Sequence, residues 1–230
     1  MIHFSNLTKK YKGATVLEVQ EMQIHSGSCF GLVGNNGAGK TTLFSLLLDL
    51  IQPSSGQVTN KGVEVSQSEI WKDHTAAFID ESFLIGYLTA GEYFEFIGQL
   101  RNSPKGEWME RLNEFEAFFN EPFLEHEKYI RDLSKGNQKK VGLAAVFIGD
   151  PELIVLDEPF ANLDPSSQIQ LKKIIADYKQ KGTTFLISSH DLTHVTDICD
   201  RIVLLEKGIP IKDIQTSPST LKELEAYFAA

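Results

Sequence analysis

Short apolar runs alternate with longer helical patterns along this chain. The run at 29–34 is almost continuously apolar, as parallel strands covered on both faces tend to be, and a glycine-rich loop separates it from a helical pattern at 41–51. Further strands are expected at 153–156, at 184–188, at 201–205 and around 208–210. Strands that alternate with helices in this way indicate βαβ units, so the pattern predicts an α/β fold with a parallel sheet.

Between about residues 89 and 148 the pattern becomes helical throughout. Thr89 and Glu92 have the spacing of a capping box, and the apolar face after them is expected to consist of Tyr93, Phe94, Phe96 and Ile97. A second amphipathic stretch covers 106–119, and Ser134 is placed to cap a third helix that runs to 148. These patterns predict a helical insert in the α/β core.

The insert divides the chain into parts of one domain. We expect a core formed by 1–88 and 149–218, the helical insert at 89–148, and a C-terminal helix at 219–230. The last helix is expected to pack through Leu221, Leu224 and Phe228.

Composition and charge limit the function classes. The chain has 230 residues, of which 42% are hydrophobic and 23% charged, as in ordinary soluble proteins. A net charge of -9 argues against a nucleic-acid partner, because binding a phosphate backbone needs a basic face. Neither a signal peptide nor a membrane-spanning apolar stretch is evident, which predicts a cytosolic protein. Cys29 and Cys199 lack metal or redox spacing and are expected to fill core space.

The loop after the first predicted strand carries a phosphate-binding pattern. It consists of Gly34, Asn35, Asn36, Gly37, Ala38, Gly39, Lys40 and Thr41. Glycines let backbone N–H groups converge on a phosphate without obstruction by Cβ atoms, and the following helix N-terminus adds positive potential. Lys40 is placed to neutralise phosphate oxygens, and the Thr41 hydroxyl is placed to ligate Mg²⁺.

Two carboxylates follow the predicted strand at 153–156. Adjacent residues at a strand end point in different directions, so Asp157 and Glu158 can divide their roles. We expect Asp157 to face a metal ion and Glu158 to face the water that attacks the γ-phosphate.

Several further segments, in the right order with these two, resemble motifs of the ABC ATPase family. Residues 133–137 are similar to the family's signature, and 162–164 to its D-loop. His190 resembles the switch histidine, and Tyr11 matches the aromatic residue that stacks on adenine. The resemblance covers essentially the whole chain.

The resemblance implies a P-loop NTPase cassette that binds ATP and Mg²⁺. Its fold would be a RecA-like parallel-sheet core with an N-terminal antiparallel β portion and an inserted helical subdomain. The implied catalytic residues are Lys40, Glu158 and His190, and the implied metal ligands are Thr41, Asp157 and Asp80. The implied nucleotide contacts are Tyr11, Gly34, Asn35, Asn36, Gly37, Ala38, Gly39, Lys40, Thr41, Thr42, Ser134, Gly136, Asn137 and Asp164.

The chain departs from the family pattern at four positions. Lys135 and Asn137 replace a glycine and the glutamine of the signature, and this variant resembles the subgroup that serves ABC-2-type membrane partners, often exporters. Asn162 replaces a D-loop glycine, which is tolerable because asparagine enters the left-handed region. Asp80 falls where the family has a glutamine, unless an offset of one residue places Glu81 there instead.

The resemblance implies the ATP-hydrolysing subunit of a membrane transporter. Two copies, identical or related, would enclose two MgATP and drive a separate transmembrane permease, so that the protein would reach the inner face of the membrane only through its partner. Phe83, Leu84, Ile85 and Tyr87 are the expected docking surface, although ordinary packing under the insert would also explain this apolar loop. A soluble non-transport ATPase and a weakly active ATP-binding switch are the alternatives.

Overall fold

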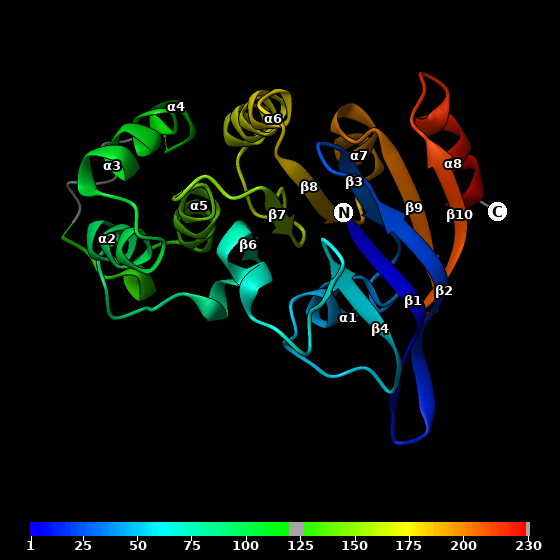
Figure 1. Ribbon diagram of the computed structural model, residues 1–230. Coiled ribbons are helices and arrows are strands. Elements are labelled where there is room, and N and C mark those ends of the chain that lie inside the picture. The colour runs from blue at the N-terminus through cyan, green and yellow to red at the C-terminus, as the bar shows by residue number, and fades with distance from the viewer. Residues whose placement is uncertain (120–126, 229–230) are drawn as a thin grey trace.

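The structure, a computed structural model, describes residues 1–119 and 127–228, and the strands among them form two β-sheets (Figure 1). An antiparallel sheet has the strand order β2-β1-β4-β5, and a six-stranded sheet has the order β10-β9-β3-β8-β7-β6. The first sheet comprises β1 (Ile2–Tyr11), β2 (Ala14–Ile24), β4 (Ser55–Asn60) and β5 (Val63–Glu64). The second comprises β3 (Cys29–Val33), β6 (Thr75–Phe78), β7 (Leu153–Leu156), β8 (Thr184–Ser189), β9 (Arg201–Glu206) and β10 (Ile209–Gln215). In this second sheet β10 alone is antiparallel to its neighbour.

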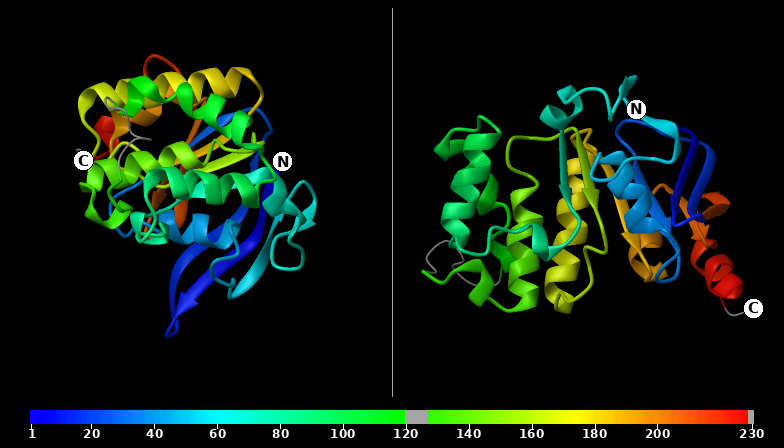
Figure 2. Two further views of the ribbon diagram at one scale, coloured as in Figure 1. Left: turned by 90° about the vertical axis from the view of Figure 1, so that its left-hand side faces the viewer. Right: turned by 90° about the horizontal axis from the view of Figure 1, so that it is seen from below.

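The helices surround the larger sheet and extend it at one end. α1 (Lys40–Leu47) follows β3, while α6 (Pro165–Gln180), α7 (Leu192–Ile198) and α8 (Thr220–Phe228) follow β7, β8 and β10. Between β6 and β7 come the helices of the insert: α2 (Ala90–Leu100), α3 (Lys105–Asn113), α4 (Glu116–Phe119) and α5 (Lys135–Ala145). The described residues also form the short 3₁₀ turns η1 (Ile70–His74), η2 (Glu81–Phe83) and η4 (Ile130–Asp132). Viewed from below, the insert and the antiparallel sheet lie at opposite ends of the molecule (Figure 2).

The larger sheet is buried on both faces because successive strand residues point to opposite sides. Phe30 and Leu32 of β3 pack with α1 and the antiparallel sheet, whereas Cys29 and Val33 pack with α5, α6 and α7. The thiols of Cys29 and Cys199 are buried and free, with their Sγ atoms 3.5 Å apart. The α/β fold and the core position of both cysteines are therefore confirmed.

Several predicted elements differ in their bounds or in what they bury. The helix predicted at 41–51 ends at Leu47, because Asp49 has a positive φ of 51° and the chain turns there. The stretch at 106–119 is two helices, and the helix expected to reach 148 ends at Ala145. The predicted C-terminal helix is α8, and residues 229–230 lie outside the described residues, as do 120–126 of the insert.

Two side chains assigned to packing faces are exposed instead. Phe96 is 39% exposed, because at 3.6 residues per turn it points roughly 160° away from the buried Phe94. Phe228 is 37% exposed and packs edge-to-face on the neighbouring Tyr227 rather than in the core, to which Leu224 belongs. Strand β6 was not predicted, because its sequence of one threonine, two alanines and one phenylalanine carries little β-propensity. Within 1–119 and 127–228, no helix is long and apolar enough to cross a membrane.

Candidate active site

The glycines between β3 and α1 shape the phosphate loop. A Cβ atom at Gly34 would lie 2.3 Å from the carbonyl oxygen of Leu205, so only glycine fits there. Gly37 and Gly39 have φ values of 81° and 104°, which L side chains rarely adopt. Because Gly39 is the N-cap of α1 and has no side chain to cap it, the first N–H groups of the helix remain available to a ligand.

A cavity of about 320 Å³ lies over this loop. Its walls are Tyr11, Val16, Asn36, Gly37, Ala38, Gly39, Lys40, Thr41, Thr42 and Glu158. Tyr11 is half exposed, with the Lys9 ammonium 4.9 Å from its ring centroid, so an aromatic face stands at the edge of the phosphate loop. The cavity thus joins an aromatic ring, a lysine and a carboxylate from distant parts of the sequence.

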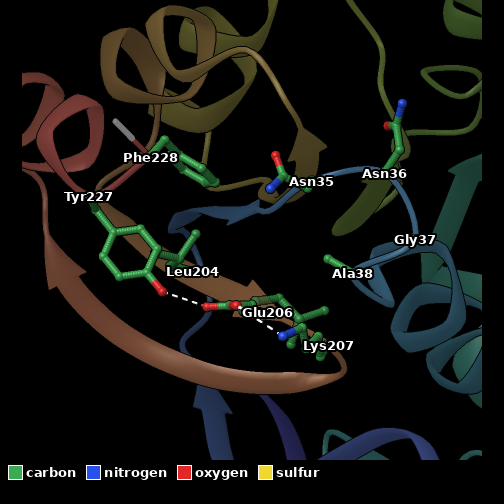
Figure 3. A pocket seen from close by; sticks show the side chains of 10 residues that line it. Asn35, Asn36, Gly37, Ala38, Leu204, Glu206, Lys207, Tyr227 and Phe228 are labelled. Carbon is green, nitrogen blue, oxygen red and sulfur yellow. Dashed lines mark hydrogen bonds and ion pairs between the residues drawn. The ribbon is translucent and has the colours of Figure 1, made fainter. Parts of the chain in front are cut away.

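A second cavity, of about 600 Å³, lies on the other side of the phosphate loop (Figure 3). Asn36, Gly37 and Ala38 border both cavities, whereas Asn35 borders only the larger one, opposite Phe228. Of the predicted phosphate-loop residues, Gly34 and Asn35 do not line the 320 Å³ cavity, whereas those from Asn36 to Thr42 do.

The two strand-end carboxylates face different partners. Asp157 accepts hydrogen bonds from the hydroxyls of Ser188 and Thr41. Glu158 accepts a 2.8 Å hydrogen bond at Oε2 from His190 Nδ1, and its Oε1 lies 3.2 Å from Lys40 Nζ. Lys40 also donates to the carbonyl of Gly34, at 2.6 Å. The residues predicted for catalysis are thus brought together within ion-pair distance.

The surroundings of Asp157 suit a hard cation. Burial raises the pKa of Asp157, and the hydrogen bonds from Ser188 and Thr41 act in the opposite direction. In the described part of the chain, no three His, Cys, Asp or Glu side chains gather in a way that could hold a metal. The protein therefore offers one carboxylate and the Thr41 hydroxyl, and such a partial oxygen set fits Mg²⁺, which keeps water and phosphate ligands.

The backbone of Glu158 is strained. Its φ of 47° lies in the left-handed region, which costs a non-glycine residue roughly 1–2 kcal/mol. The N–H of Glu158 donates to Ser188 Oγ at 3.0 Å, and its carbonyl accepts from Lys139 Nζ at 2.9 Å. Hydrogen bonds on both sides of the Cα atom therefore hold a conformation that the sequence gives no reason to expect.

The signature residues begin α5 and lie apart from the cavity over the phosphate loop. Ser134 is the N-cap of α5, and its Oγ accepts from the N–H of Asn137 at 3.2 Å. A Cβ atom at Gly136 would lie 2.9 Å from the carbonyl oxygen of Asn162, whose φ is 63°, so the left-handed Asn162 is observed as expected. None of Ser134, Gly136 and Asn137 borders the 320 Å³ cavity. The predicted signature contacts at the start of α5 and the phosphate loop are thus at separate places in a single chain.

Two residues predicted to bind nucleotide or metal, Asp164 and Asp80, are helix N-caps. Asp164 is the N-cap of α6 and lies 3.0 Å from Lys140 Nζ. Hydrogen bonds from Ser167 and Ser166 lower the pKa of Asp164 strongly. Asp80 caps η2, where its carboxylate accepts from the N–H of Ser82 at 2.7 Å. A metal-binding role for Asp80 and a nucleotide contact for Asp164 remain predictions.

An apolar groove of about 320 Å³ lies between the larger sheet and the insert. It is lined in part by Phe83 and Leu84. Phe83 is 60% and Tyr87 73% exposed, and the Arg131 guanidinium lies 4.7 Å from the Tyr87 ring centroid. Phe83 and Tyr87 are therefore mostly exposed, whereas Leu84 of the same run packs against the core cluster, as ordinary packing would have it.

Two residues of the site were missed from the sequence. β7 and β8 are parallel neighbours with Leu156 opposite Ile187, so the next residue, Ser188, comes beside Asp157. The order of the strands would have indicated this contact. No local pattern marks Lys139, whose contact with Glu158 depends on how α5 packs.

Comparisons with known proteins agree with this geometry. The family model for ABC transporters matches residues 17–161. An uncharacterized ABC transporter ATP-binding protein of Nostoc is 37% identical over 81% of this chain and 56% of its own length. The uncharacterized ABC transporter ATP-binding protein YhaQ of Bacillus subtilis is 30% identical over 99% of this chain and 74% of its own length. A solved ATP-binding subunit of an ABC transporter has a TM-score of 0.86 and 26% identity, covering 100% of this chain and 95% of that one. The chain spans about half the length of the first two curated relatives that it matches.

Proposed function

The chain belongs to the family of ABC transporter ATP-binding proteins, and on that premise we propose that it binds and hydrolyses MgATP as the motor subunit of a membrane transporter. The observation that carries the proposal is the convergence of Lys40, Thr41, Asp157, Glu158 and His190 beside one cavity.

The residues around the cavity have distinct roles in this proposal. Tyr11 stacks on the adenine, and the N–H groups of residues 36–42 with the Lys40 ammonium bind the phosphates. Thr41 and Asp157 would hold Mg²⁺, which neutralises phosphate charge when it is bound. Glu158 accepts the proton of the attacking water, and His190 fixes the orientation of the Glu158 carboxylate through Nδ1.

A second cassette completes the site. Because Ser134 lies outside the cavity over the phosphate loop, the N-terminus of α5 would reach the γ-phosphate held by a partner subunit, either a second copy or a related chain. ATP then holds the dimer together, and hydrolysis releases it. Asp164 and Asp80 keep their proposed nucleotide and metal contacts in the assembled dimer.

The transport step would be carried out by a separate permease. We assign this chain to the group that serves ABC-2-type permeases, since Lys135 replaces the first glycine of the signature. The groove beside Phe83 and Tyr87 is the docking surface, through which the protein reaches the inner face of the membrane. In this proposal 1–88 and 149–218 form the nucleotide-binding core, 89–148 the helical subdomain, and 219–230 a terminal helix.

Glu158→Gln tests the assignment. The variant should still bind ATP but hydrolyse it about 10²–10⁴ times more slowly, because the amide cannot accept a proton from water. Lys40→Ala should abolish ATP binding, since it removes the cation that faces the phosphates. ATP binding is measured with a fluorescent nucleotide and turnover by phosphate release. Normal turnover by Glu158→Gln would show that the base has been assigned wrongly, and nucleotide binding by neither wild type nor variant would refute the function.

A further inference from the structure

We propose that Lys139 is a positioning residue for Glu158, and that Glu81 links this lysine to the loop at the docking groove. This inference rests on the proposed ATPase function. Lys139 lies on α5, which β7 separates in sequence from Glu158, yet its ammonium reaches the Glu158 carbonyl at 2.9 Å.

The ammonium of Lys139 is buried between two acidic residues. Lys139 is 5% exposed, and besides the Glu158 carbonyl its Nζ lies 3.6 Å from Glu81 Oε1. The Glu81 side chain is only 17% exposed, and its Oε1 has no hydrogen-bond partner within the described residues. A buried carboxylate oxygen without a hydrogen bond needs a nearby cation, so Lys139 is held between Glu81 and Glu158.

The contact with Glu158 acts on the backbone and not on the carboxylate. The peptide before the Glu158 Cα atom is fixed by Ser188. The carbonyl of the peptide after it accepts from Lys139 Nζ at 2.9 Å and from the N–H of Ala161 at 3.3 Å. With φ at 47°, this residue would relax toward negative φ once the Lys139 bond is lost, because the remaining 3.3 Å bond from Ala161 is longer and lacks a charged donor. Relaxation would turn the carboxylate away from His190. Lys139 therefore determines where the proposed base points, without touching the substrate.

Glu81 connects this arrangement to the groove. It is the first residue of η2, which ends at Phe83 in the groove wall. A displacement of η2 by a partner in the groove would move the Glu81 carboxylate relative to Lys139. The same ammonium would then transmit the displacement to the Glu158 peptide. The ion pair is thus a direct physical connection between the groove and the catalytic carboxylate.

The test compares Lys139→Met, Lys139→Arg, Glu81→Gln and the double variant Lys139→Met/Glu81→Gln with wild type. Lys139→Met should lower kcat about tenfold, the kinetic equivalent of one charge-assisted hydrogen bond, with KM for ATP changed less than about twofold. Lys139→Arg should restore most of kcat, because its guanidinium can still donate. Glu81→Gln should give a smaller fall, and the double variant should be no slower than Lys139→Met. Lys179→Met on α6, which removes an ion pair with Asp200 away from the cavity, is the control and should keep wild-type kcat.

Crystal structures of wild type and Lys139→Met separate this inference from the proposed function. In the variant, Glu158 should leave the left-handed region and lose its contact with His190. This readout holds even if the wild type proves to have no ATPase activity, which would refute only the proposed function. Should Lys139→Met not fold, the double variant, which buries no unpaired carboxylate, takes its place in both measurements. Unchanged kcat, or an unchanged Glu158 backbone in the variant structure, would overturn the inference.

Discussion

Phe83→Asp should separate the protein from its membrane partner while its fold and basal ATPase activity survive. Full burial of a phenylalanine side chain is worth about 1.5–3 kcal/mol. Phe83 is 60% exposed, so only the remaining two-fifths of its area is lost, at a cost of about 1 kcal/mol. For a chain of this size that cost lowers Tm by about 2–4 °C. By contrast, truncation of the fully buried Phe94 to alanine should cost about 3–5 kcal/mol.

The assay for Phe83→Asp has three readouts: Tm, basal phosphate release, and co-purification with membranes of the native host. Ile169→Asp is the matched control, because Ile169 is 55% exposed on α6 and does not line the groove. Only Phe83→Asp should lose co-purification. Tyr87→Asp should behave in the same way, although an aspartate there can pair with Arg131 and offset the lost cation–π contact. If Phe83→Asp melts as early as Phe94→Ala, or still co-purifies with membranes, the docking argument is wrong.

Three further predictions concern the cavity and its second half. With MgATP, Glu158→Gln should form a dimer, and adding Ser134→Arg should prevent it because the arginine blocks the γ-phosphate contact. The masses are measured by size exclusion with light scattering, and a dimer of the Ser134→Arg protein would count against the two-subunit site. Asp80→Gln should keep ATPase activity with a shallower dependence on Mg²⁺, and Asp80→Ala should weaken it, whereas superimposed titrations would remove Asp80 from the metal site. Burial raises the pKa of Asp157 in the folded protein above its value in the unfolded chain. The free energy of unfolding should therefore fall as pH rises from the ordinary aspartate pKa to the raised one, because Asp157 ionises more readily in the unfolded chain. Asp157→Asn should abolish this loss, and parallel plots of Tm against pH for variant and wild type would contradict it.

Features set by local spacing could be predicted from the sequence. The phosphate loop depends on glycine positions along a few consecutive residues, and Thr89 forms the expected capping box with Glu92. The left-handed conformation of Asn162 follows from its residue type. In each case the interacting atoms are within a few residues of one another, so the sequence alone contains the geometry.

Features set by tertiary packing could not be predicted. The positive φ of Glu158 is held by hydrogen bonds that include those from Ser188 and Lys139, and both of these partners come from other elements. The distance of Asp80 from the insert predicts a place near the metal, but the direction of its carboxylate depends on its hydrogen bond from Ser82 in the turn of η2. Strand β6 forms because β7 pairs with it, which outweighs its weak propensity.

Two buried cysteines, Cys29 at the start of β3 and Cys199 between α7 and β9, can report the opening of the larger sheet. Burial raises the pKa of the Cys199 thiol well above its usual value, and Cys29 lies at the start of β3 in contact with it. Both thiols are buried, so a reagent in solution reaches neither of them while the sheet is closed. Rates of thiol modification therefore measure how often this sheet opens. The decrease of those rates on addition of nucleotide would give the free energy by which ligand binding stabilises the closed sheet.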